Sequence, residues 1–130
     1  MTQIAYIDAS ALTKVVVDEA DSGAMLRCYA EAERVACSRI GVVEVRRAVG
    51  RRRHDRDHLD AVIASVEIME FDSATAERAS AMAPRGLRTL DAIHLATAAG
   101  LLGELGAFVT YDLRQAEAAR ALGLPVLAPA

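Results

Sequence analysis

The chain has 130 residues and a formal net charge of −3, a size that favours one domain spanning residues 1–130. No apolar run approaches the ~20 residues of a membrane-spanning helix, and no basic-then-apolar leader opens the sequence. These features predict a cytoplasmic protein without membrane contact. Cys28 and Cys37 fit no zinc or disulfide pattern, so we expect two free thiols.

The spacing of apolar residues predicts strands that alternate with helices. In chain order, we expect a strand at 4–8, helices over 9–17 and 21–33, a strand at 35–38, and a helix from about 40 that runs past a group of arginines, with helical spacing continuing over 57–65. The second half adds an edge strand at 66–71, helices from 72 to near 84–86 and over 89–102, a strand at 107–110, a helix over 113–122 and a strand at 125–127. This order predicts an α/β sandwich with a mainly parallel sheet.

Four carboxylates stand in or beside apolar segments, where acidic side chains are rare unless they are paired or bind a metal. They are Asp8, Glu44, Asp91 and Asp112. Asp8 and Asp112 close strands, and ligand sites form at the carboxyl edge of a parallel sheet. We expect all four to meet there, where a divalent cation would relieve their mutual repulsion. Oxygen ligands favour Mg²⁺ or Mn²⁺, and such a site suits hydrolysis of a phosphodiester.

Each acid also has a simpler explanation. Asp8 and Asp112 are at positions where aspartate often caps the following helix. Glu44 and Asp91 lie near helix starts, where a carboxylate complements the helix dipole. His94 follows Asp91 by three residues and could reach the same site, but packing at a helix interface is the favoured interpretation.

Basic side chains are concentrated directly after Glu44, at Arg46, Arg47, Arg51, Arg52, Arg53 and Arg56. On a continuous helix, Arg46, Arg53 and Arg56 would fall close together around the wheel, where they could contact RNA phosphates or an acidic partner segment. Aromatic residues are few, so base stacking is not the expected mode of recognition. Two nearby histidines lack a third metal ligand at a recognisable spacing and are expected at the surface, namely His54 and His58.

Four segments taken in order, 6–14, 42–48, 87–98 and 109–112, resemble the motifs of PIN-domain nucleases, and among them the VapC-type toxins of VapBC toxin–antitoxin modules. The resemblance implies a three-layer α/β/α fold and a Mg²⁺- or Mn²⁺-dependent endoribonuclease. It carries over Asp8, Glu44, Asp91 and Asp112 as metal ligands and catalytic acids. Ser10 and Thr110 look like groups that position water or support those acids. A homodimer, an RNA substrate and a VapB-type antitoxin that blocks the acidic groove are also implied.

Other functional classes fit less well. A phospho-acceptor receiver domain needs a late lysine, and Lys14 is the only lysine of the chain. A haloacid-dehalogenase-type phosphatase would place an aspartate where Ser10 stands. A catalytically inactive PIN-like module that binds RNA or protein remains the alternative, because ligands alone do not prove catalysis.

Overall fold

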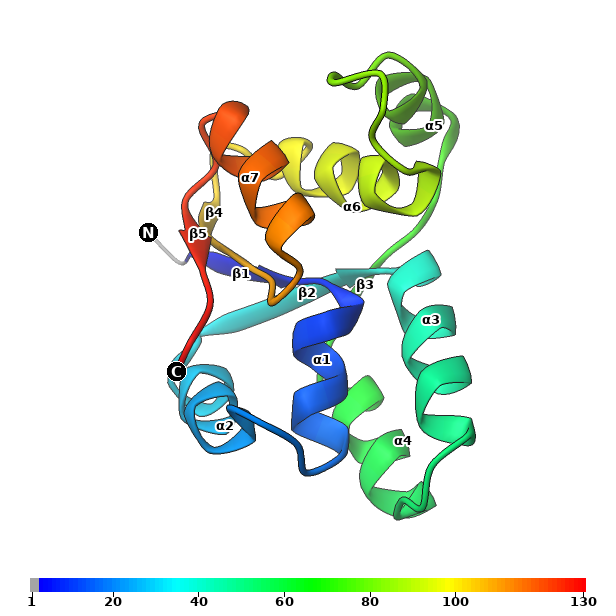
Figure 1. The fold of residues 1–130 in the computed structure, drawn as a ribbon, viewed down its shortest axis with the longest axis vertical. Helices are drawn as coiled ribbons and strands as arrows, with labels where there is room; N and C mark the ends of the chain where they lie inside the picture. Colours follow the sequence, from blue (N-terminus) through cyan, green and yellow to red (C-terminus); the bar gives the residue numbers. More distant parts are fainter. Residues whose placement is uncertain (1–2) are drawn as a thin grey trace.

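The computed structural model describes residues 3–130 and is built around a five-stranded sheet (Figure 1). The strands are β1 (Ile4–Ile7), β2 (Arg34–Ser38), β3 (Glu67–Met69), β4 (Leu105–Val109) and β5 (Val126–Leu127). They are arranged in the order β3-β2-β1-β4-β5, and every neighbouring pair is parallel. The prediction of a parallel sheet is confirmed.

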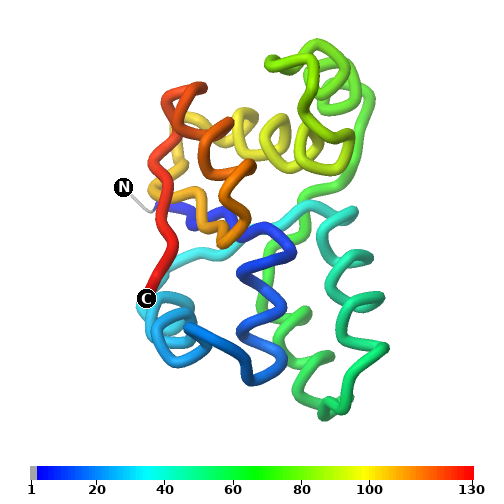
Figure 2. Tube along the Cα trace, in the orientation of Figure 1, coloured from blue at the N-terminus to red at the C-terminus, as the bar shows by residue number. Residues whose placement is uncertain are grey.

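Helices cover both faces of this sheet. One face carries α1 (Ala9–Val16), α2 (Ser22–Glu31), α3 (Arg39–Gly50) and α4 (Arg56–Ala64), and the other carries α5 (Ser73–Ser80), α6 (Thr89–Ala99) and α7 (Leu113–Ala121) (Figures 1 and 2). The predicted three-layer α/β/α sandwich is therefore confirmed. Over residues 3–130, the structure has no helix whose length and apolar character would let it cross a membrane.

Alternate residues of the central strand β1 face different layers. Tyr6 packs with Leu95 and Phe108 on the α6 and α7 side, whereas Ile7 packs with Leu12 on the α1 to α4 side. Because β1 is covered on both faces, it appears in the sequence as a continuous apolar run rather than an alternating one.

The prediction of helical structure continuing past the arginines is wrong. The helix that contains Glu44 ends at Gly50, and a new helix begins at Arg56. The side chain of Asp55 caps the second helix by accepting hydrogen bonds from the backbone amides of Asp57 and His58 at 2.9 and 3.2 Å. An aspartate cap of this kind stabilises a helix start, so the chain forms two helices instead of one.

The break also separates the three arginines that a single helix would have grouped. Arg46 lies on α3 and forms an exposed ion pair with Asp60 of α4 at 3.3 Å. Arg53 lies in the connecting segment, and Arg56 opens α4. In Figure 1 this segment is at the far end of α3 from the sheet. The helical-wheel argument for a shared arginine face therefore does not hold.

The last helical turn that was expected before residues 84–86 is also absent, because α5 ends at Ser80. A proline disfavours the helical conformation for the residue before it, and Pro84 follows Ala83 in this segment. The other helix and strand boundaries differ from the predicted ones by a few residues at most.

Candidate functional site

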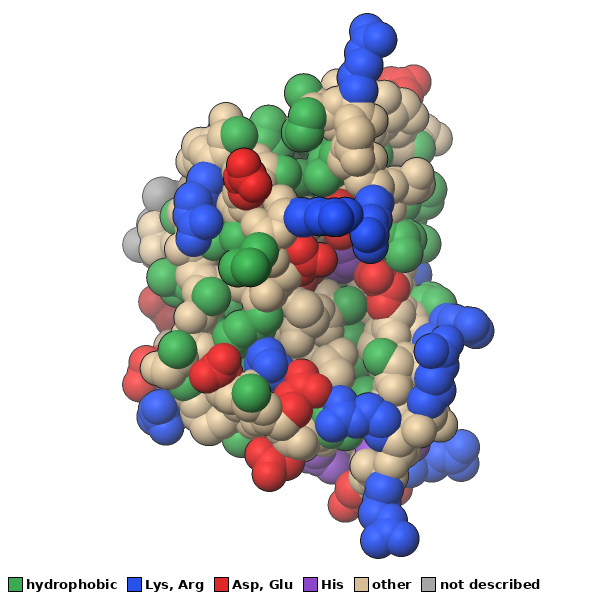
Figure 3. All heavy atoms as spheres, viewed as in Figure 1, with side chains coloured by type: hydrophobic (Ala, Val, Ile, Leu, Met, Phe, Trp, Pro, Cys, Tyr) green, Lys and Arg blue, Asp and Glu red, His purple; other side chains and the backbone are tan. Residues whose placement is uncertain are grey.

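The four acids are all found at the carboxyl edge of the sheet, around its switch point. β1 and β4 are neighbours in the sheet, but the chain leaves β1 toward β2 and leaves β4 toward β5. Crevices beyond the strand ends at such a point are the usual ligand sites of open parallel sheets. Figure 3 shows acidic and histidine side chains around a hollow at this place, where α1, α3, α6 and α7 meet.

Asp8 is the most enclosed of the acids and is held through both carboxylate oxygens. Its Oδ1 accepts hydrogen bonds from Ser10 Oγ at 2.6 Å and from the Ala11 amide at 3.1 Å. Its Oδ2 accepts one from Thr110 Oγ1 at 2.5 Å. Burial raises the pKa of Asp8, while the hydroxyls of Ser10 and Thr110 act in the opposite direction. Asp8 is thus a helix cap, as its simpler explanation stated, and also a charge fixed at the sheet edge.

Ser10 and Thr110 also connect Asp8 to the segment after β4. Ser10 Oγ accepts a hydrogen bond from the amide of Tyr111 at 2.9 Å. Thr110 Oγ1 accepts one from the amide of Asp112 at 3.1 Å. Both hydroxyls therefore touch Asp8, and each fixes part of the backbone that leads to Asp112.

Asp112 and Asp91 lie at the starts of the two helices on the other face. Asp112 is exposed and caps α7, its Oδ1 accepting from the amides of Arg114 and Gln115 at 2.9 and 3.2 Å. Asp91 is half-buried in the first turn of α6. Burial raises the pKa of Asp91, the negative charge of Asp112 raises it further, and the positive charge of Arg88 lowers it. The two acids are therefore close enough to repel each other.

Glu44 is half-buried on α3 and is bound by His94. The distance from Glu44 Oε1 to His94 Nε2 is 2.6 Å, and that from His94 Nδ1 to the Tyr6 hydroxyl is also 2.6 Å. His94 is buried, with only 3% of the residue exposed, as the packing interpretation predicted. That interpretation did not include the hydrogen bond between His94 and Glu44. The spacing from Asp91 to His94 was the only sequence signal for it. Nothing in the sequence indicated Tyr6.

The donor set fits a hard divalent cation in its chemistry, since it consists of carboxylate oxygens. Several of these oxygens form no hydrogen bond with residues 3–130, namely Glu44 Oε2, Asp112 Oδ2 and both oxygens of Asp91. Within the same residues, however, no three Asp, Glu, His or Cys side chains are arranged closely enough to hold one ion. Mg²⁺ is usually held by one or two carboxylates together with water, so the unpaired oxygens of these acids are still suited to it.

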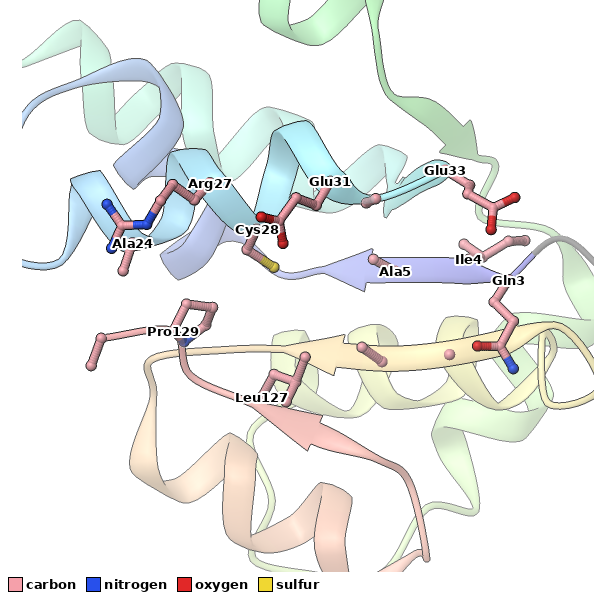
Figure 4. Close-up of a pocket in the computed structure, with 14 residues that line it drawn as sticks. Gln3, Ile4, Ala5, Ala24, Arg27, Cys28, Glu31, Glu33, Leu127 and Pro129 are labelled. Atoms are coloured by element: carbon pink, nitrogen blue, oxygen red, sulfur yellow. The ribbon is translucent and has the colours of Figure 1, made fainter.

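Two of the hollows among residues 3–130 lie next to Asp91 and Cys28. One, of about 520 Å³, adjoins Asp91 between the 83–88 segment and α7, with Arg88 and Arg114 among its lining residues. The other, of about 550 Å³, lies between α2 and the strands, and the sulfur of Cys28 points into it (Figure 4). The second hollow shares no residue with the acidic edge, whereas the first is continuous with it through Asp91.

Comparisons with known proteins give consistent matches along the chain. The PIN domain model matches residues 5–121. Ribonuclease VapC46 of Mycobacterium tuberculosis is 37% identical over 125 residues, which cover 95% of this chain and 96% of that protein.

Two solved structures share the fold. M. tuberculosis VapC20, described as a sarcin–ricin loop cleaving toxin, has a TM-score of 0.74 at 19% identity, over 98% of this chain and 100% of that one. VapBC2 of Rickettsia felis, solved bound to a promoter DNA fragment, has a TM-score of 0.71 at 14% identity, over 98% and 100% of the two chains.

Proposed function

This chain belongs to the PIN-domain family, in its VapC branch, and we propose that it is an endoribonuclease that acts as the toxin of a VapBC toxin–antitoxin module. One observation supports the proposal more than any other. Four carboxylates that lie far apart in the sequence, Asp8, Glu44, Asp91 and Asp112, all lie at one edge of the sheet. Hydrolysis of an RNA phosphodiester is the reaction that such an acidic edge suits.

We assign these four carboxylates as the residues that would hold Mg²⁺ or Mn²⁺. When bound, such a cation neutralises charge on the scissile phosphodiester. Ser10 and Thr110 keep the Asp8 carboxylate in place through their hydroxyls. Asp91 accepts no hydrogen bond from residues 3–130 and has a raised pKa caused first by burial. Both of its oxygens are therefore available to a cation or to a water molecule at this edge.

Binding of RNA would use positive side chains around the same edge. Arg88 and Arg114 line the hollow that adjoins Asp91. Their positive charges would offset the repulsion between the acids and a phosphate group that lies beside them. Arg46, Arg53 and Arg56 lie farther away, and we assign them to RNA phosphates or to the antitoxin. Arg53 and Arg56 are exposed and form no ion pair with any residue that the structure describes.

Cleavage of purified structured RNAs tests the proposal. The protein is incubated with Mg²⁺, with Mn²⁺ or with EDTA, beside the variants Asp8→Asn and Asp72→Asn. Asp72 is a matched control, because it also caps a helix, through the amide of Thr75 at 2.8 Å, but lies outside the site. We expect metal-dependent cuts at defined positions with the wild type and with Asp72→Asn, and loss of cleavage with EDTA and with Asp8→Asn.

An inactive PIN-like module that binds RNA or protein is the second candidate. It would keep the same fold and the same acids, because carboxylates placed at a sheet edge do not by themselves prove catalysis. Binding of the same RNAs without cleavage under any metal, and with equal affinity for the wild type and Asp8→Asn, would support this alternative over the nuclease.

The toxin assignment also predicts two kinds of assembly in the cytoplasm, where the RNA substrates are. We propose a homodimer, and we propose a complex with a VapB-type antitoxin because the similar structure from R. felis is a VapBC2 complex. Light scattering of the protein alone measures the first. Co-purification with a small protein encoded next to this chain, together with inhibition of RNA cleavage by that protein, tests the second.

A further inference from the structure

His94 connects the acidic edge to the core of the sheet. The residue lies on α6, but its two ring nitrogens bond to side chains from two other elements. Nδ1 is 2.6 Å from the hydroxyl of Tyr6 on β1, and Nε2 is 2.6 Å from Oε1 of Glu44 on α3. The Tyr6 side chain is fully buried, and the exposed fraction of His94 is 3%. No step of the proposed hydrolysis uses either side chain.

The hydrogen bonds around Tyr6, His94 and Glu44 determine which atom donates in each pair. The amide of Ser38 donates to the Tyr6 oxygen at 3.1 Å. The buried Tyr6 hydroxyl must then donate its own proton, since an unmet buried donor is costly, and His94 Nδ1 is the acceptor within reach. Nδ1 therefore carries no proton, and Nε2–H donates to Glu44. In this arrangement the Tyr6 hydroxyl and both ring nitrogens of His94 each have a partner.

The imidazole is also held in place by packing. Tyr6 stands edge-on to the ring, with 5.8 Å between centroids, and is itself stacked on Phe108 at 5.4 Å. On the side of α3, Gly41 lies so close that a Cβ there would be 2.7 Å from His94 Cε1. The position of Nε2 is thus fixed from both layers of the fold.

We propose that His94, held by Tyr6, is a positioning residue that fixes the Glu44 carboxylate at the acidic edge. With Oε1 bound to His94, Oε2 of Glu44 accepts no hydrogen bond from residues 3–130 and would be available to a divalent cation. This role of His94 rests on the proposed metal-dependent hydrolysis. It concerns the position of the Glu44 carboxylate and not a step of the reaction. Groups that hydrogen-bond metal-ligating carboxylates are usually needed for metal affinity, and their loss costs about 10–100-fold.

Three variants separate positioning from packing. His94→Leu removes the donor to Glu44, whereas His94→Gln keeps an N–H donor at nearly the same place. Tyr6→Phe removes the hydroxyl that sets the proton on Nε2. Thr97→Val is the matched control on α6, because Thr97 is also buried but bonds only to the backbone of its own helix, at Ile93 O.

Two measurements need no RNA. Mn²⁺ affinity is measured by calorimetry, and long-range ¹H–¹⁵N spectra of the histidine rings report which nitrogen of His94 carries the proton. We expect the Nε2–H form in the wild type and a mixed or changed form in Tyr6→Phe. Mn²⁺ affinity should fall about 10–100-fold in His94→Leu, recover mostly in His94→Gln and stay unchanged in Thr97→Val.

The results distinguish this inference from the proposed function. Mn²⁺ affinity that is unchanged in His94→Leu, equally reduced in Thr97→Val or absent from the wild type overturns the positioning role, as does an Nδ1–H ring. If His94→Leu does not fold, His94→Gln and Tyr6→Phe still give the affinity and the proton position. A wild type that shows the expected Mn²⁺ and ring behaviour but cuts no RNA would overturn the nuclease and leave the positioning role intact.

Discussion

Substitution of Gly41 by alanine tests how tightly α3 packs on His94. A Cβ at this position would be 2.6 Å from Cys37 Sγ and 2.7 Å from His94 Cε1. Carbon atoms attract best at about 3.5–4.0 Å, so the imidazole would have to move by about 0.8 Å. It cannot do so without lengthening its hydrogen bond to Glu44 or to Tyr6.

The expected energy follows from two opposing effects. Overpacking of this kind costs about 1–3 kcal/mol. Replacing a helical glycine by alanine gains about 1 kcal/mol, so Gly41→Ala should destabilise the protein by about 0–2 kcal/mol. Gly50 ends the same helix and a Cβ there would meet nothing within 4 Å. Gly50→Ala should therefore be free of the clash and at least as stable as the wild type, so a lower stability of Gly41→Ala than of Gly50→Ala reports the clash.

Urea unfolding followed by circular dichroism gives both free energies of unfolding, and equal m-values confirm that the variants are compared on the same transition. A titration with Mn²⁺ adds a second readout, since a displaced His94 should weaken Mn²⁺ binding in Gly41→Ala only. If Gly41→Ala is as stable as Gly50→Ala, the close approach of α3 to the imidazole is refuted.

Three further predictions concern other groups. Burial raises the pKa of Asp8, so the ionised carboxylate destabilises the folded metal-free protein. Asp8→Asn removes this charge and should have a higher melting temperature than the wild type in EDTA at pH 7. Added Mn²⁺ should raise the melting temperature of the wild type only. Burial acts to raise the pKa of Glu19, but the hydrogen bond from Arg52 and its positive charge help to lower it below the ordinary value of 4.5. This stabilisation is present above that pH and lost as the pH falls below it, so the deficit of Glu19→Gln in urea unfolding should shrink in acid. Burial raises the pKa of both thiols, but Cys37 is fully buried whereas Cys28 is half-buried and lines a hollow, so a thiol reagent should label one cysteine in the native protein and two in urea.

The acidic edge could be predicted from the sequence because each acid lies in or directly after an apolar segment of its own. Asp8 and Asp112 each follow an apolar run directly, and the carboxyl ends of parallel strands share one edge. Asp91 was placed by the helical spacing of its own segment. These inferences needed only the order of strands and helices, which the structure confirms.

Two features could not be obtained in this way. The contact between Glu44 and His94 joins residues fifty positions apart and depends on how α3 packs on α6, which no periodicity records. The break after Gly50 was missed for a different reason. Asp55 is a good helix cap, but the helical spacing on either side of it masked this signal.

The two outer strands of the sheet have a consequence for how copies of the protein can associate. β3 has three residues and β5 has two. At the β3 edge, Glu67 is ion-paired with Arg34 at 2.6 Å, and Pro125 and Pro129 flank β5. Short edges with charged or proline residues discourage addition of a foreign strand. Pairing of two copies through the edges of their sheets is therefore disfavoured.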